Sequence, residues 1–274
     1  MRITLSTLQS MRERGEKFAM LTAYDYPTAR IAAAAGVHSL LVGDSMGNVV
    51  LGQTTTREVP LEFMLVLAEA VRRGAPEVFL VGDLPFEAMR SPGATQAAAR
   101  RFVAIGCDAV KIECGKSDVE TVRAIAAEGV VVIAHLGLRP QQVLSPDGYR
   151  AQARDAAGVA ALVADAREMA AAGAGMILLE AVPDEAGAAV RAAVGVPVVG
   201  CGAGPACDGF VVVTPDMLGW SEGRPPRFVP VLADLRSEAA RGMRGYVEAI
   251  AKGEYPGPQH SYALRAGDST KGSA

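Results

Sequence analysis

The chain has 274 residues, of which 50% are hydrophobic and 21% are charged, which is enough apolar material for a large core and too much for a disordered chain. Its 27 Lys and Arg residues against 30 Asp and Glu residues give a net charge of −3, which disfavours binding to nucleic acid or to anionic membranes. No segment resembles a secretory signal or a membrane span, so we expect a cytoplasmic protein.

Eight apolar runs recur along the chain, separated mostly by Ala-rich amphipathic segments. The runs cover residues 18–23, 39–44, 78–83, 109–113, 131–136, 176–181, 196–202 and 209–213. They are continuous rather than alternating, which is typical of parallel strands buried on both faces. An open doubly wound sheet is the alternative, but no GxGxxG motif follows the first run.

Eight strand–helix units without a break in composition predict an α/β fold, a (β/α)₈ TIM barrel. We expect one domain over residues 1–274. After Trp220 the sequence indicates a C-terminal helix, followed by a mobile tail from about residue 263.

Ionisable residues lie where the predicted strands end. They are Asp44 with Ser45 beside it, Asp83, Lys111, Glu113, His135 and Glu180. A charge at the end of an apolar strand costs several kcal/mol to desolvate unless it is paired or binds a cation. Because barrel enzymes place their chemistry at the carboxyl ends of the strands, these residues predict the active site.

Three of these residues, Asp44, Asp83 and Glu113, end consecutive strands, so their oxygens should converge on one point. Hard oxygen ligands without Cys favour Mg²⁺ over zinc. The alternative is a set of structural salt bridges, in which Lys111 neutralises one carboxylate.

His135 is the only histidine at a predicted strand end, and it is either a substrate contact or a satisfied core residue. Glu180 follows one strand later, on the far side of the mouth from Asp44 and Asp83, within an apolar segment. A carboxylate held away from the metal is suited to act as a general base. A helix cap or an arginine partner is the alternative role for Glu180.

Motifs in this order and spacing resemble the ketopantoate hydroxymethyltransferase (3-methyl-2-oxobutanoate hydroxymethyltransferase) family of the phosphoenolpyruvate mutase/isocitrate lyase superfamily. They are MLTAYDYPTA (20–29), LVGDSMGNVVLG (41–52), AVRRGAP (70–76), GDLPF (82–86), VKIE (110–113), HLGLRPQ (135–141), LLEAVP (178–183), GCGAG (200–204), DG (208–209) and YPGPQHSY (255–262). The resemblance covers nearly the whole chain.

The resemblance implies transfer of a hydroxymethyl group from the co-substrate 5,10-methylenetetrahydrofolate to 3-methyl-2-oxobutanoate, giving 2-dehydropantoate for pantothenate synthesis. It also implies a homodecamer. The implied roles are Mg²⁺ ligation by Asp44 and Asp83, with Glu113 reaching the metal directly or through water, carboxylate binding by Ser45 and Lys111, a pocket position for His135, and proton acceptance by Glu180. Asp44, Asp83, Ser45, Lys111 and His135 together would form the substrate site.

The chain departs from the family pattern at three loop positions. Asp147 and Ala153 stand where the family usually has glycine, and Phe210 stands where it has glutamine. These departures leave open a paralogue that acts on another 2-oxo acid in secondary metabolism. A related metal-dependent carbon–carbon lyase is a second alternative, although no KKCGH-like segment occurs. A non-catalytic barrel is disfavoured because the costly strand-end charges remain.

Overall fold

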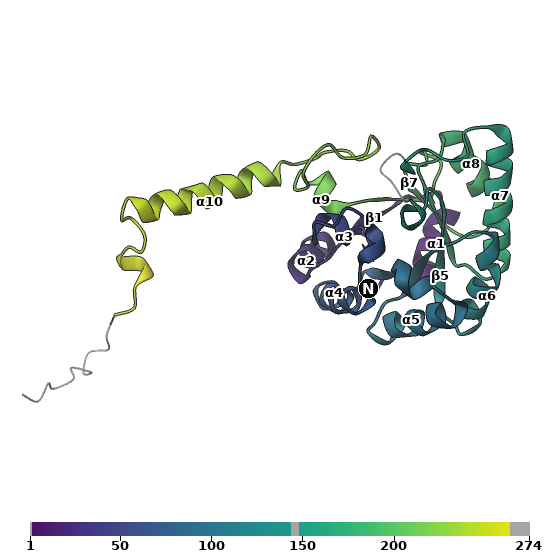
Figure 1. Cartoon of the computed structure of the whole chain (residues 1–274), viewed down its shortest axis with the longest axis horizontal. Coiled ribbons are helices and arrows are strands. Elements are labelled where there is room, and N and C mark those ends of the chain that lie inside the picture. The colour runs from purple at the N-terminus through teal and green to yellow at the C-terminus, as the bar shows by residue number, and fades with distance from the viewer. Residues whose placement is uncertain (1, 144–147, 264–274) are drawn as a thin grey trace, which may run out of the picture.

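Eight parallel strands close into a barrel in chain order, with the last strand paired to the first (Figure 1). The computed structural model describes residues 2–143 and 148–263. The strands are β1 (Phe18–Thr22), β2 (Ser39–Val42), β3 (Phe79–Asp83), β4 (Ala109–Glu113), β5 (Val131–Gly137), β6 (Met176–Glu180), β7 (Val198–Cys201) and β8 (Gly209–Val212). The predicted α/β TIM barrel is confirmed. Of the other expectations, Asp147 and the predicted tail beyond residue 263 lie outside the described residues.

Helices follow most strands and cover the outside of the barrel (Figure 1). The α-helices of the described residues, including those that do not cover the outside, are α1 (Leu5–Glu13), α2 (Tyr26–Ala34), α3 (Met46–Val49), α4 (Leu61–Gly74), α5 (Pro92–Ala104), α6 (Val119–Ala127), α7 (Ala156–Ala171), α8 (Asp184–Ala193), α9 (Thr214–Met217) and α10 (Leu235–Ala251). Polar residues begin several of them. Asp155, for example, accepts the Gly158 N–H at 2.7 Å and caps α7.

The apolar residues form two buried layers, one inside the barrel and one between strands and helices. Phe18, Phe79 and Met176 belong to the inner layer, together with Leu8 and Met11 of α1. Helix α1 forms hydrogen bonds with residues that precede the strands, so it covers the amino end of the barrel. The carboxyl end is left free to form a cavity.

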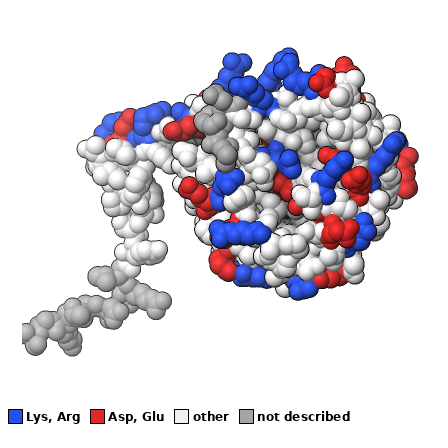
Figure 2. Space-filling model, turned by 45° about the vertical axis from the view of Figure 1, so that its right-hand side comes forward, with Lys and Arg blue, Asp and Glu red and all other residues white. Residues whose placement is uncertain are grey.

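The chain after β8 departs from the regular barrel pattern. The short helix α9 comes first, and α10 then projects away from the barrel with no buried residue (Figure 1). In Figure 2 acidic and basic side chains are interspersed over the barrel, whereas part of the projecting segment is white. Within the described ranges, no helix combines the length and the apolar character needed to cross a bilayer.

Candidate active site

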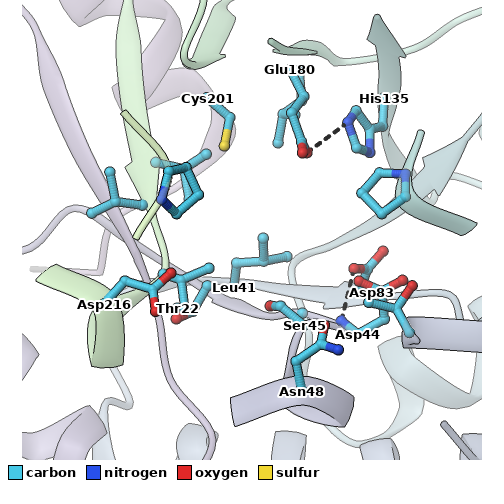
Figure 3. A pocket seen from close by; sticks show the side chains of 18 of the residues that line it. Thr22, Leu41, Asp44, Ser45, Asn48, Asp83, His135, Glu180, Cys201 and Asp216 are labelled. Atoms are coloured by element: carbon cyan, nitrogen blue, oxygen red, sulfur yellow. Dashed lines mark hydrogen bonds and ion pairs between the residues drawn. The ribbon is translucent and has the colours of Figure 1, made fainter. Parts of the chain in front are cut away.

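The carboxyl ends of the strands surround a cavity of about 220 Å³ at the barrel mouth (Figure 3). Six of the seven predicted site residues line it: Asp44, Ser45, Asp83, Lys111, His135 and Glu180. The strand ends differ slightly from the predicted ones, because β2 stops at Val42 and β5 continues past His135 to Gly137. The closure of the barrel therefore brings together side chains that lie up to 136 residues apart in sequence.

Asp83 ends β3, and its side chain is 0% exposed. Its Oδ2 accepts the backbone N–H of Asp44 at 3.0 Å and lies 2.8 Å from Lys111 Nζ. Its Oδ1 is buried and has no hydrogen-bond partner among the described residues. Burial, aided by the charge of Asp44 and opposed by Lys111, raises the pKa of Asp83 to about 8. A cation beside the two aspartates would favour their charged forms.

Lys111 lies on β4 among the acidic residues. Burial opposes its charged form, but the charges of Asp83, Asp44 and Glu113 outweigh burial and raise the pKa of Lys111 above its ordinary value. The salt bridge between Lys111 and Asp83 is one of the structural salt bridges that the sequence left open as the alternative to a metal site. Lys111 faces three carboxyl groups, however, and among the described residues it forms an ion pair only with Asp83.

His135 links Lys111 to Glu180 across the cavity. Its Nδ1 lies 3.3 Å from Lys111 Nζ, and its Nε2 lies 3.3 Å from Glu180 Oε2 (Figure 3). Burial and the charge of Lys111 lower the pKa of His135. Because the lysine ammonium can only donate, Nδ1 of the neutral imidazole must accept, and Nε2 carries the proton that faces Glu180. The ring thus turns Nε2 toward the Glu180 carboxylate, but Nε2 makes no hydrogen bond with any described residue.

Glu180 itself ends β6 and is the more open partner, with a side chain 19% exposed against 1% for His135. In Figure 3 it lies on the opposite side of the cavity from Asp44 and Asp83, as the sequence predicts. No arginine pairs with Glu180 among the described residues, and it caps none of the helices described. The carboxylate is therefore free to contact a substrate.

Glu113 does not line the cavity, and its side chain is 0% exposed. Its carboxyl group turns toward the backbone N–H of Gln141, which lies 3.1 Å and 3.2 Å from the two oxygens. Burial and the charge of Asp44 raise the pKa of Glu113 well above its ordinary value. The three carboxylates thus do not meet at one point, because the Gln141 backbone draws Glu113 away from the cavity.

Gln141 is a site residue that the strand-end argument missed. Its side chain is fully buried, and its Nε2 donates to Asp44 Oδ2 at 2.8 Å and to the carbonyl of Leu84 at 3.0 Å. It therefore positions Asp44 and Glu113 at once. The strand-end argument looks for charges that are costly to bury, and the amide of Gln141 is uncharged and lies beyond the strand end. Its place at the end of the HLGLRPQ motif is the only sequence feature that could have marked it.

Ser45 follows Asp44 and begins α3. Its Oγ lies 2.8 Å from the hydroxyl of Tyr24, a buried residue just after β1. Burial raises the pKa of the Tyr24 phenol, which therefore stays protonated and can donate to Ser45. This contact fixes the serine hydroxyl at the rim of the cavity, where it can in turn donate to an anion.

The donor set fits a hard divalent cation. Among the described residues no group of three or more His, Cys, Asp and Glu side chains is arranged to hold a metal ion. Mg²⁺, however, commonly binds proteins through one or two carboxylates and completes its shell with water and substrate oxygens. The unpartnered Asp83 Oδ1 beside Asp44 offers such a pair of ligands.

The two departures from the family pattern that the structure describes lie away from this cavity. Phe210 points outward from β8, is 37% exposed and does not line the cavity. Ala153 does not line it either, but adopts a φ of 51°, a backbone region that favours glycine. The residue types of the cavity wall are therefore unaffected by these two substitutions.

Solved structures with the same fold support the class of barrel. The model has a TM-score of 0.62 to a phosphonopyruvate hydrolase complex with oxalate and Mg²⁺, at 16% identity, covering 95% of this chain and 93% of that one. For 2,3-dimethylmalate lyase, a PEP mutase/isocitrate lyase superfamily member, the TM-score is 0.59 at 20% identity, covering 94% and 90%. The barrel thus has the fold of that superfamily.

The family follows from closer relatives. Residues 2–258 match the family model described as ketopantoate hydroxymethyltransferase. The chain is 44% identical to the 3-methyl-2-oxobutanoate hydroxymethyltransferase of Thiobacillus denitrificans over 96% of its length and 100% of the relative. It is 41% identical to the enzyme of the same name from Moorella thermoacetica, covering 95% and 98%. The chain belongs to the ketopantoate hydroxymethyltransferase family, and the predictions of family and enzyme class are confirmed.

Proposed function

We propose that this chain transfers a hydroxymethyl group from 5,10-methylenetetrahydrofolate to 3-methyl-2-oxobutanoate, giving 2-dehydropantoate and tetrahydrofolate. C3 of the keto acid loses a proton, and its electron pair forms the new bond to the one-carbon unit. Water supplies the hydroxyl group as the bonds to the folate nitrogens break. The observation that carries the proposal is the opposition of Glu180 to the Asp44–Asp83 pair across one small cavity.

Glu180 accepts the C3 proton in this proposal. Its carboxylate lies in the cavity wall, and His135 Nε2 lies 3.3 Å from its Oε2, close enough to limit the directions in which the carboxylate can turn. His135 is in turn held by Lys111, so the base is oriented from behind by two buried side chains. His135 is a positioning residue here, and Glu180 is the catalytic residue.

The carboxylate of the keto acid binds at the opposite rim. Ser45 donates its hydroxyl hydrogen, and the Lys111 ammonium supplies positive charge. Asp44 and Asp83 would hold Mg²⁺, with Glu113 acting on Asp44 through Gln141 or on a metal-bound water. When bound, Mg²⁺ supplies Lewis-acid stabilisation of negative charge on the 2-oxo oxygen. Each group therefore has one role in the proposal and lies on one side of the cavity.

The proposal includes a homo-oligomer, which we expect to be a decamer in the cytoplasm. The projecting helix α10 exposes a row of apolar side chains, namely Leu235, Met243, Tyr246, Val247 and Ile250. The outward residues Ala19 of β1 and Phe210 of β8 are exposed as well, since no helix within residues 2–143 and 148–263 covers them. A helix of another subunit would bury both surfaces.

An activity assay tests the proposed reaction. We expect consumption of 3-methyl-2-oxobutanoate that depends on methylenetetrahydrofolate and on Mg²⁺, and that exceeds the rates with shorter and longer 2-oxo acids. Asp83→Ala should weaken metal binding and lower turnover together. Full activity of chelator-treated protein would remove the metal from the mechanism, and faster turnover of another 2-oxo acid would reassign the substrate.

A further inference from the structure

We infer that the pterin and glutamate parts of the folate donor bind in a second cavity beside the mouth of the barrel. The inference rests on the proposed function, which needs a donor much larger than the keto acid. Pockets for ligands of that size span about 300–1,000 Å³. The mouth cavity measures only about 220 Å³, whereas the second cavity measures about 850 Å³.

The two cavities share a rim. Ser45, Asn48, Val213, Asp216 and Pro226 line both of them. In Figure 3 the side chains of Asn48 and Asp216 lie below the mouth cavity, across from Glu180. A ligand in the second cavity can therefore extend its one-carbon unit over this rim toward the keto acid.

Asp216 provides the recognition group for the pterin ring. Its carboxylate forms no hydrogen bond or ion pair with any other described residue, although the residue is only partly exposed. The pterin ring presents an amino group and an adjacent ring N–H on one edge, and a carboxylate can accept both. Asn48 donates to the carbonyl of Gln53 at 2.8 Å, which leaves its own carbonyl oxygen as a further acceptor on the same wall.

The outer part of the cavity offers a flat ring and positive charge. Trp220 is 48% exposed and lines this cavity, where it can stack on a heteroaromatic ring. Arg224 forms no hydrogen bond or ion pair within the described ranges, while Arg236 donates only to the carbonyl of Ser221 at 3.3 Å. These two guanidinium groups balance the charges of Asp216 and Glu222 on the same lining, and they suit the carboxylates of a glutamate tail.

A separate observation also marks this wall as incomplete. Two buried polar atoms of lining residues, Gln53 Oε1 and Ser221 Oγ, have no hydrogen-bond partner among the described residues. Buried polar groups are rarely left unpaired in native proteins. Both atoms have almost no accessible surface, so their side chains would have to turn into the cavity to bind a polar ligand.

Two donors of different size test the inference. Formaldehyde can supply the one-carbon unit without a pterin, whereas methylenetetrahydrofolate must occupy the proposed cavity. Asp216→Asn and Arg224→Gln should each raise the KM for methylenetetrahydrofolate by about tenfold or more, because each removes a charged hydrogen-bond partner. The ratio of folate-supported to formaldehyde-supported turnover should fall by a similar factor.

Binding is measured separately with tetrahydrofolate as the probe, by calorimetry on the Mg²⁺-loaded protein. Trp220 is the only tryptophan of the chain, so its fluorescence should change on binding, and this change should be lost in Trp220→Phe. Asp165→Asn and Arg167→Gln are matched controls on the remote helix α7 and should bind as the wild type does.

The outcomes separate the two proposals. If the wild type transfers no hydroxymethyl group from either donor, the proposed function fails. If it does so, but Asp216→Asn and Arg224→Gln keep both the wild-type KM for the folate and the wild-type tetrahydrofolate affinity, the second cavity is not the donor site. Tetrahydrofolate binding to the wild type without any change in Trp220 fluorescence would support that same negative conclusion.

Discussion

At the scale of single residues, the site separates proton transfer from charge stabilisation. Glu180 and His135 form one side of the cavity, and the aspartates form the other. The buried His135 is a poor candidate for the base at neutral pH. The Lys111 ammonium donates to Nδ1, which is the only ring nitrogen with a free lone pair. This arrangement supports the proposal that Glu180 accepts the proton.

The assignment predicts the behaviour of Glu180→Gln. The variant keeps the size of the side chain, so it should still bind Mg²⁺ and keto acid, but exchange of the C3 hydrogen with deuterated solvent should fall by about 10² to 10⁴. NMR of the keto acid follows this half-reaction without folate. Ser45→Ala should instead mainly weaken keto acid binding. Exchange at the wild-type rate in Glu180→Gln would assign the base to His135 or to a hydroxide.

Gln141 holds two acidic residues, and its loss should be costly. Gln141→Ala removes the side-chain amide that donates to Asp44 Oδ2 and to the Leu84 carbonyl, while the backbone N–H that faces Glu113 remains, and the free energy of unfolding should fall by about 1–3 kcal/mol. Urea unfolding measures the change, with the exposed neighbour Gln142→Ala as the control. Equal stability of the two variants would show that water replaces the glutamine amide.

At the scale of elements, small residues on the strands let the helices approach the barrel closely. Gly82 precedes Asp83 on β3, and a Cβ added at Gly82 would lie only 2.3 Å from the ring of Phe102 on α5. The contact between strand and helix therefore depends on the absence of a side chain at this position. Because Gly82 and Asp83 are adjacent, this packing also determines where the Asp83 carboxylate, a proposed metal ligand, lies.

This packing predicts opposite effects for two Gly-to-Ala changes. Gly82→Ala should lower the free energy of unfolding by about 1–3 kcal/mol, because Phe102 or β3 must shift, and it should also lower turnover. Gly93→Ala lies in α5 with open space around its Cβ and should be neutral or raise stability by roughly 0.4–1 kcal/mol. Chemical denaturation of both variants tests the pair, and equal losses would contradict the packing argument.

At the scale of the whole molecule, α10 is the feature that a single chain does not explain. Its apolar side chains project into solvent, and an isolated helix of 17 residues gains little stability without packing. The outer surfaces of β1 and β8 lack a covering helix. Burial of both surfaces between subunits would stabilise the helix and the barrel together.

Light scattering should therefore report a particle well above a dimer of the 28.4 kDa chain. Val247→Asp places a charge in the apolar row of α10 and should shift the mass toward smaller species. Arg241→Asp, on the charged side of the same helix, is the control and should leave the assembly intact. A stable 28 kDa particle from the wild type would overturn the proposed assembly.

Sequence alone determined the class of fold and most of the charged side chains of the cavity wall. Continuous apolar runs report strands that are buried on both faces, and a charge such as Asp83 or Glu180 at the end of such a run is too costly to be incidental. Both signals are local, so they can be read along the chain. The family motifs added the expected reaction, and the family itself is confirmed.

Only the tertiary structure decided how those residues meet. The contact between Gln141 and Asp44 joins residues 97 positions apart, and the turn of Glu113 away from the cavity depends on that same loop. The direction in which α10 leaves the barrel likewise depends on which surfaces the chain after β8 can pack against. These features arise from closure of the barrel, which brings distant segments into contact, and no periodicity within a single segment records such contacts.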